Sequence, residues 1–179
     1  MSRSTVHARI RLTALLAGVF VGLFFAVGAT ATAPPTPSLA TIANTMARTV
    51  EVNDPREHFA SLGRPTIVTV SDGSGGTLTA ALGTRSPTMD GYGQLTFFWH
   101  DRQFLGFDSR FEAVAVATFA SGGPGEIVVR YGHYAPHDAY CCPSLAPVAV
   151  TYRWGGERLV VDGREPLFPG LLVPVKLLG

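Results

Sequence analysis

An uncharged apolar run near the N-terminus constrains this chain most, because a water-soluble fold cannot leave such a segment exposed. The run extends from Leu12 to Ala31 and consists mainly of Leu, Val, Phe, Ala and Gly. It follows a basic flank that contains Arg3, Arg9 and Arg11. A basic flank before an apolar stretch is typical of an export signal, and this stretch is long enough to cross the hydrocarbon layer as a helix. The sequence therefore predicts an extracytoplasmic protein.

Residues 1–31 are predicted to be either a signal peptide or an N-terminal membrane anchor. Ala29-Thr30-Ala31 fits the A-x-A pattern before a signal-peptidase cut, and we slightly favour cleavage near Ala31 over retention. Without cleavage the run becomes an anchor whose N-terminus is inside, as the basic flank requires. The rest of the chain is thus expected to be secreted or held at the cell membrane by its N-terminal segment.

Residues 32–50 are predicted to form a Pro-rich spacer and a short helix. The stretch from Ala33 to Ser38 is stiff and poor in core-forming residues, which is typical of an extended linker. Ser38 is a suitable N-cap for a helix that follows it. We expect Asn53-Asp54-Pro55 to end this helix. Apolar residues recur at helical spacing at Leu39, Ile42, Met46 and Val50.

Residues 51–179 are predicted to form one β-rich extracytoplasmic domain, because short β-type runs alternate there with Gly, Pro, Asn and Asp. The whole chain of 179 residues has 20 Gly, 13 Pro and only 15% charged residues, which favours strands and turns over surface helices. The tail from Arg164 is expected to close the core edge as an extended segment without a regular strand. Strands are expected at Thr66–Val70, Thr77–Ala81, Gln94–His100, Gln103–Phe107, Ala113–Phe119, Glu126–His133, Val148–Trp154 and Arg158–Val161.

Short connections predict antiparallel pairing of these strands. Asp101-Arg102 and Gly155-Gly156 each separate two strand-like runs, as in β-hairpins. Alternation along one strand places Val150, Tyr152 and Trp154 on the same face, which we expect to be core. The predicted fold class is therefore mainly β (or α+β). It is an antiparallel, sandwich-like meander in a single domain, with one short N-terminal helix.

Several segments resemble the LppP/LprE-type lipoproteins of actinobacteria in their order and spacing. The most specific is Cys141-Cys142-Pro143-Ser144, which is followed by a strand ending in Tyr152-Arg153-Trp154. The resemblance covers residues 65–165 and includes Leu95–Gly106 and Glu126–Tyr131. It implies a location in the cell envelope but no particular reaction. The chain departs from the family at one point, because both cysteines lie far from the apolar run and no lipobox cysteine is placed for acylation.

The adjacent Cys141 and Cys142 are the chain's only two cysteines. In an exported protein they can be free thiols, a vicinal disulfide, or bridges to another molecule. A bond between neighbours closes no long loop, so it cannot staple the fold. We favour a rigid turn between two strands, with a thiol-redox role as the alternative.

Three ligand-type side chains lie close together in the sequence, at His133, His137 and Asp138. They offer nitrogen and oxygen ligands of the kind that zinc takes. Pro136 prevents a helical i, i+4 pair, and a metal site needs convergent ligands with supporting partners. We therefore favour solvated loop histidines, keep a metal or hydrolase centre as the alternative, and expect no bound cofactor.

The stretch from Asp72 to Gly76 is predicted to be a turn, because it lacks the Lys and Ser/Thr of a phosphate-binding loop. A nucleophilic Ser74 would need a base and an orienting acid, and the sequence does not place His58, His100 or His133 beside it. We therefore assign no catalytic residue. His100-Asp101 is expected at an exposed hairpin tip, where the aspartate favours the turn.

Aromatic residues offer a further candidate surface, since they can line a groove for a glycan or lipid. On strands they are more often core. The residues concerned are Tyr131, Tyr134, Tyr140, Tyr152 and Trp154.

Charge and motif together favour a non-enzymatic binding or structural module of the cell envelope. Fourteen basic and thirteen acidic residues nearly cancel, so nucleic acid is not an expected partner. The expected partners are an envelope protein, a lipid or a glycan. The membrane itself is a further partner if the N-terminal segment is not cleaved. The alternative is an extracytoplasmic hydrolase or thiol-redox enzyme, centred on His133, His137 and Asp138 or on the Cys141–Cys142 pair.

Overall fold

A computed structural model describes residues 35–87, 92–113, 115–164 and 174–178 of the chain. These residues belong to one compact unit, Ala33–Gly179. Residues 1–34, which include the predicted export segment, lie outside the described residues. Within the described part of the chain, no helix combines the length and the apolar character that a membrane span requires.

The helix predicted after the spacer is present as α1, Leu39–Ala47. The Ser38 hydroxyl oxygen accepts a hydrogen bond from the backbone N–H of Thr41 at 3.0 Å, which makes Ser38 the N-cap. The predicted end of the helix was wrong. The chain leaves the helix after Ala47, because the next residues join a sheet as strand β1, Thr49–Glu51.

The larger sheet has seven strands, and all of its pairs are antiparallel. Its order is β11-β1-β2-β4-β5-β6. Strand β4 is long enough to pair with both β2 and β3 on one edge, while β5 occupies its other edge. Besides β1, the strands are β2 His58–Ala60, β3 Ile67–Ser71, β4 Thr77–Ser86, β5 Gln94–His100, β6 Gln103–Phe107 and β11 Val175–Leu177.

The smaller sheet has four antiparallel strands in the order β10-β9-β8-β7. Each strand pairs with its neighbour in the sequence, so this sheet is a simple meander, as predicted. Its strands are β7 Val116–Gly123, β8 Glu126–His133, β9 Leu145–Trp154 and β10 Leu159–Asp162.

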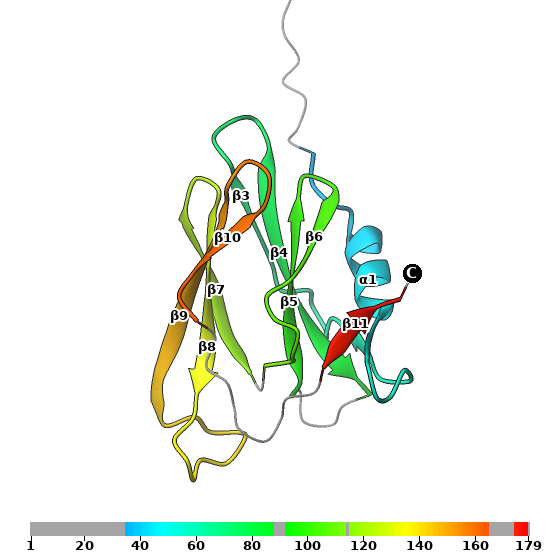
Figure 1. Ribbon diagram of the computed structural model, residues 1–179, viewed down its shortest axis with the longest axis vertical. Helices are drawn as coiled ribbons and strands as arrows, with labels where there is room; N and C mark the ends of the chain where they lie inside the picture. The colour runs from blue at the N-terminus through cyan, green and yellow to red at the C-terminus, as the bar shows by residue number, and fades with distance from the viewer. Residues whose placement is uncertain (1–34, 88–91, 114, 165–173, 179) are drawn as a thin grey trace, which may run out of the picture. The chain divides into compact units, whose positions relative to one another are not determined.

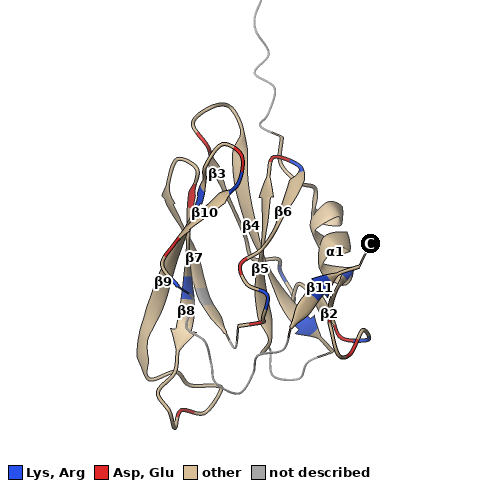
Figure 2. Cartoon of the chain, in the orientation of Figure 1, with Lys and Arg blue, Asp and Glu red and all other residues tan. Residues whose placement is uncertain are grey.

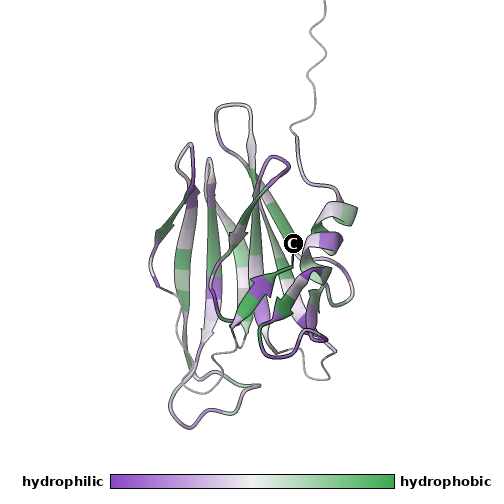
Figure 3. Ribbon diagram, turned by 45° about the vertical axis from the view of Figure 1, so that its right-hand side comes forward, coloured by the Kyte–Doolittle hydropathy of each residue, from purple (hydrophilic) through white to green (hydrophobic). Residues whose placement is uncertain are grey.

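The larger sheet is covered on both faces, by α1 on one and by the smaller sheet on the other (Figure 1). Strand β5 explains why both faces are covered, because its side chains alternate between the two faces of the sheet. Phe97 and Trp99 pack in a cluster with Ile42 and Met46 of α1, whereas Phe98 packs with residues of the smaller sheet. Hydrophobic residues accordingly concentrate in the strands rather than in the connecting loops (Figure 3).

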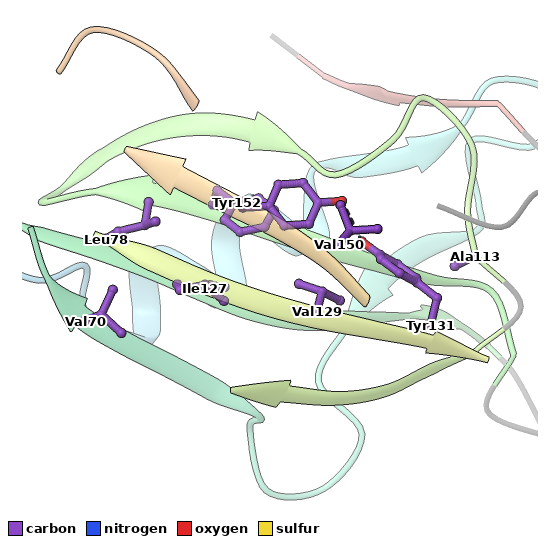
Figure 4. Packing of buried hydrophobic residues seen from close by; sticks show 10 residues of the cluster. Val70, Leu78, Ala113, Ile127, Val129, Tyr131, Val150 and Tyr152 are labelled. Carbon is purple, nitrogen blue, oxygen red and sulfur yellow. Dashed lines mark hydrogen bonds between the residues drawn. The ribbon is translucent and has the colours of Figure 1, made fainter. Parts of the chain in front are cut away.

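The core between the sheets contains a hydrogen-bonded chain of polar groups. In Figure 4, Leu78 of the larger sheet faces side chains of β8 and β9. The hydroxyls of Tyr131 and Tyr152 lie 2.8 Å apart, and the Tyr131 hydroxyl donates to the Asp108 carboxylate at 2.8 Å. Burial raises the pKa of Asp108 to about 6, although the Tyr131 hydrogen bond opposes this shift.

The predicted fold class is confirmed, and three predicted strands have the observed bounds: β5, β6 and β8. Val150 and Tyr152 are buried as expected, whereas Trp154, expected on the same core face, is only half-buried. The tail prediction was partly wrong, because β11 is a regular strand that pairs with β1 at the sheet edge, although residues 165–173 lie outside the described residues. Strands β1 and β2 were not predicted, since three residues are too few to show alternation.

We expect Asp108→Asn to remove a pH dependence from stability. The folded pKa of Asp108, about 6, exceeds its ordinary value of 3.8, so the folded state holds this proton more tightly than the unfolded state. The wild-type free energy of unfolding should therefore fall, relative to that of the variant, by about 2 kcal/mol between pH 4 and pH 7. Urea unfolding at several pH values measures this difference. Parallel pH profiles for the two proteins would contradict the assignment.

Candidate functional site

An apolar groove lies between α1 and β2, with a volume of about 420 Å³. One wall is a row of residues on the helix, and the other is β2 together with the segment that follows it. The helix contributes Leu39, Ile42, Ala43 and Ala47, and the other wall contributes His58, Phe59, Ala60, Ser61 and Pro65.

The groove exists because Ala43 and Ala47, which have small side chains, lie on the helix face that is turned toward β2. Leu39, Ala43 and Ala47 stand four residues apart and so share one face of the helix. The helix is fixed to the sheet by other positions, Ile42 and Met46, whose side chains are buried. Leu39 at the end of the row is 65% exposed, so an apolar surface continues to the edge of the groove.

Two polar side chains interrupt the apolar lining, and both belong to the β2 wall. His58 Nδ1 lies 3.3 Å from the backbone oxygen of Arg56. The Ser61 hydroxyl lies 3.8 Å from the sulfur of Met46. The lining is otherwise apolar, which is the usual character of sites for small ligands with a few polar groups that orient them.

A second cluster forms where the loop between β3 and β4 meets the tip of the β5–β6 hairpin. The predicted turn from Asp72 to Gly76 is present, and Asp72 Oδ1 accepts hydrogen bonds from the backbone N–H groups of Ser74 and Gly76. The other carboxylate oxygen, Oδ2, lies 2.8 Å from His100 Nε2. These bonds, led by that of His100, hold the pKa of Asp72 well below its ordinary value.

His100 is more buried than predicted, and the expectation of an exposed ring was wrong. Its side chain is 17% exposed, because the ring stacks on Trp154 of the smaller sheet with ring centres 4.0 Å apart. Asp101 does occupy the turn as expected, with a φ of 53°. A side chain at position 76 would place its Cβ 2.5 Å from the Asp72 carboxylate, so only glycine permits this close packing.

His100 joins the two sheets through its stacking on Trp154, and the Asp72–His100 pair does not form a nucleophilic triad. Both ring nitrogens face carboxylates, since Nδ1 lies 3.8 Å from Asp101. Ser74 bonds to Asp72 through its backbone N–H, and none of its described hydrogen bonds reaches a histidine. The other two histidines considered as bases lie on different strands, at the start of β2 for His58 and at the end of β8 for His133.

The loop between β8 and β9 carries the two cysteines, which form a disulfide with each other. Both residues are exposed. Tyr140, the preceding residue, is 44% exposed, and its backbone oxygen accepts a hydrogen bond from the Tyr134 hydroxyl at 2.8 Å. The ring of Tyr140 also contacts that of Tyr92, with ring centres 6.0 Å apart. The disulfide thus lies at the surface of a loop that aromatic side chains support.

Asp138 organises this same loop. Its Oδ2 accepts hydrogen bonds from the backbone N–H groups of Ala135 and Ser144, at 2.7 and 2.8 Å, and from the Ser144 hydroxyl at 3.0 Å. These bonds, chiefly that from the Ser144 N–H, lower the pKa of Asp138. Among the described residues, no three side chains of His, Cys, Asp or Glu are grouped to hold a metal ion, and that includes the set of His133, His137 and Asp138.

Charged residues lie mainly in loops and at strand ends (Figure 2), and one partly buried group gathers around Arg85 of β4. The guanidinium lies 2.8 Å from Glu51, 3.1 Å from Glu112 and 3.5 Å from Glu57. Burial raises the pKa of Glu112 to about 7, while Arg85 opposes the shift. The cluster ties β1 to β4, and we assign it a structural role.

Sequence reasoning missed the groove and the contacts of His100. The helical spacing of Leu39, Ile42 and Met46 identified α1. This spacing does not show which strand Ala43 and Ala47 face. The five aromatic residues proposed from the sequence as a binding surface lie in three different places. Tyr131 and Tyr152 are core, Trp154 stacks on His100, and Tyr134 and Tyr140 belong to the disulfide loop. None of these five residues lines the α1–β2 groove.

Comparison with known families gives one match. Residues 74–157 match the model of the LppP/LprE lipoprotein family, which confirms the resemblance over that segment. This segment contains the Asp101 turn, β8 and the Cys141–Cys142 loop. No curated protein and no solved structure is significantly similar to the chain.

We expect His100→Ala to lower the free energy of unfolding by about 2 kcal/mol. The substitution leaves the Asp72 carboxylate, which is 2% exposed, without its histidine partner and removes the stacking on Trp154. His137→Ala is the matched control, because His137 is exposed, and it should change stability by less than about 0.5 kcal/mol. Urea unfolding followed by tryptophan fluorescence measures both. Equal effects of the two substitutions would contradict a joining role for His100.

Proposed function

We propose that this chain, whose residues 74–157 match the LppP/LprE lipoprotein family, is a non-enzymatic module of the cell envelope that binds an acyl chain in the α1–β2 groove. The family match supports an extracytoplasmic, membrane-associated protein. The groove is formed by residues that precede the matched segment, so it supports the binding role independently of the family.

The observation that carries the binding role is the apolar lining of the groove. Its volume of about 420 Å³ falls within the range of small-ligand sites, which is roughly 300–1,000 Å³. Alanines at positions 43, 47 and 60 leave this space, and larger side chains there would fill it. Burial of an aliphatic chain against such a surface is favourable by about 25 cal/mol for each Å² removed from water.

The connection to the N-terminal segment favours a membrane lipid over a glycan as the ligand. The apolar run ends at Ala31, and the helix begins about eight residues later at Leu39. Even a fully extended chain keeps these two residues within roughly 30 Å of each other. The last part of the spacer is itself fixed to the sheet, because Pro37 is buried and the Thr77 hydroxyl donates to the Pro35 oxygen at 3.0 Å. When the run is retained as an anchor instead of being cleaved, a groove on so short a tether can reach acyl chains of the same membrane.

Two of the groups considered for catalysis, Asp138 and His100, are engaged in holding the fold, which supports binding over reaction at these positions. Asp138 accepts three hydrogen bonds within its own loop, and Asp72 holds His100 against the smaller sheet. In the groove itself, His58 and Ser61 are polar groups that suit the orientation of a lipid head or carboxylate.

We expect Ala43→Phe to weaken acyl-chain binding at least tenfold, because the ring would occupy the space between α1 and β2. The test uses residues 33–179 and follows the fluorescence of cis-parinaric acid, a polyene fatty acid, on titration. The matched control is Ala40→Phe, since Ala40 is exposed on the same helix and does not line the groove.

Saturable binding that Ala43→Phe abolishes and Ala40→Phe preserves would support the groove as the site. Equal loss in both variants would point to a general effect on α1. The absence of saturable binding to the unsubstituted protein would refute the proposal.

A further inference from the structure

The exposed disulfide between Cys141 and Cys142 lies far along the chain from the groove and makes no contribution to it. Both residues are exposed in the loop between β8 and β9, so a molecule in solution can approach either sulfur. They are also the chain's only two cysteines, so no third thiol within the molecule competes for them.

The loop is held together by bonds that do not involve sulfur. Asp138 links the two sides of the loop, because its carboxylate accepts hydrogen bonds from Ala135 on one side and from Ser144 on the other. The Tyr134 hydroxyl bonds to the Tyr140 oxygen, and the Cys142 N–H donates to the Ala139 oxygen at 2.9 Å. The backbone around the cysteines therefore has its own support when the disulfide is open.

The disulfide itself has little to contribute to the stability of the fold. A crosslink stabilises mainly by restricting the unfolded chain, and this effect grows with the number of residues that the crosslink encloses. A bond between neighbouring residues encloses none. This disulfide is exposed, contributes little to folding and lies in a loop with independent support. It can therefore open and close while the protein stays folded.

We propose that Cys141–Cys142 is a site of reversible thiol–disulfide exchange with low-molecular-weight thiols outside the membrane. A thiolate attacks one cysteine sulfur, forms a mixed disulfide with it, and releases the other cysteine as a thiolate. A second thiol then attacks the mixed disulfide. The small thiols are oxidised to their disulfide, the pair of cysteines takes up two electrons and two protons, and excess small disulfide reverses each step.

The first test is reduction of the folded protein. The full-length chain in mild detergent is treated with dithiothreitol, quenched with N-ethylmaleimide, and analysed by intact mass with and without urea. We expect two adducts on the folded protein, formed at a rate within about tenfold of that in urea, since both cysteine residues are exposed. Labelling that appears only when the protein unfolds would overturn the proposal.

The second test asks whether the neighbouring cysteine resolves the mixed disulfide, a property that a purely structural turn does not need. The reduced protein is exposed to oxidised glutathione. We expect the wild type to return to its internal disulfide without a lasting adduct, whereas Cys142→Ser should keep one glutathione. A persistent adduct on the wild type, or none on the variant, would contradict exchange at this site.

The third test separates exchange from a structural role. Replacement of both cysteines by serine should change the melting temperature by less than about 3 °C, because no loop closure is lost. A larger fall would show that the disulfide supports the fold and would overturn the proposal. These outcomes do not depend on whether the groove binds an acyl chain.

Discussion

Strand β5 is buried on both faces, and the two layers that cover the larger sheet depend on it. Its segment Leu95-Thr96-Phe97-Phe98-Trp99 is fully buried, so neither face of the strand meets water. Aromatic side chains bury large areas, and both faces of such a strand must be covered by other elements. Phe97 and Trp99 are covered by a cluster that includes α1, and Phe98 packs against Tyr152 with ring centres 4.5 Å apart.

The candidate sites arise from how these covering layers attach. Helix α1 packs against the larger sheet through Ile42 and Met46. Ala43 and Ala47 therefore face β2 across the open groove. The smaller sheet packs through Val150 and Tyr152, which brings Trp154 onto His100 and projects the loop between β8 and β9 from its end. The groove belongs to the helix side of the larger sheet and the disulfide to the smaller sheet, so their roles can be separated by substitution.

Local patterns predicted the elements whose signals are contained within a few residues. The continuous apolar character of β5 and the alternation in β8 gave the observed bounds, and Asp101 lies in the turn that its type favours. The helix start was correct because the Ser38 cap acts locally. Its end was not, because Val50 fits the helical spacing but belongs to β1, where Thr49 pairs with Leu177 near the other end of the chain.

The sequence by itself determined the antiparallel β class, the helix that begins after Ser38 and the adjacency of the two cysteines, because each follows from neighbouring residues. Tertiary structure decided which groups meet. The approach of His100 to Asp72, the encirclement of Arg85 by three glutamates and the space beside Ala43 all join segments distant in the sequence. The spacing of residues along a helix or strand predicts which of them share a face. What that face contacts depends on how the helix and the smaller sheet pack against the larger sheet.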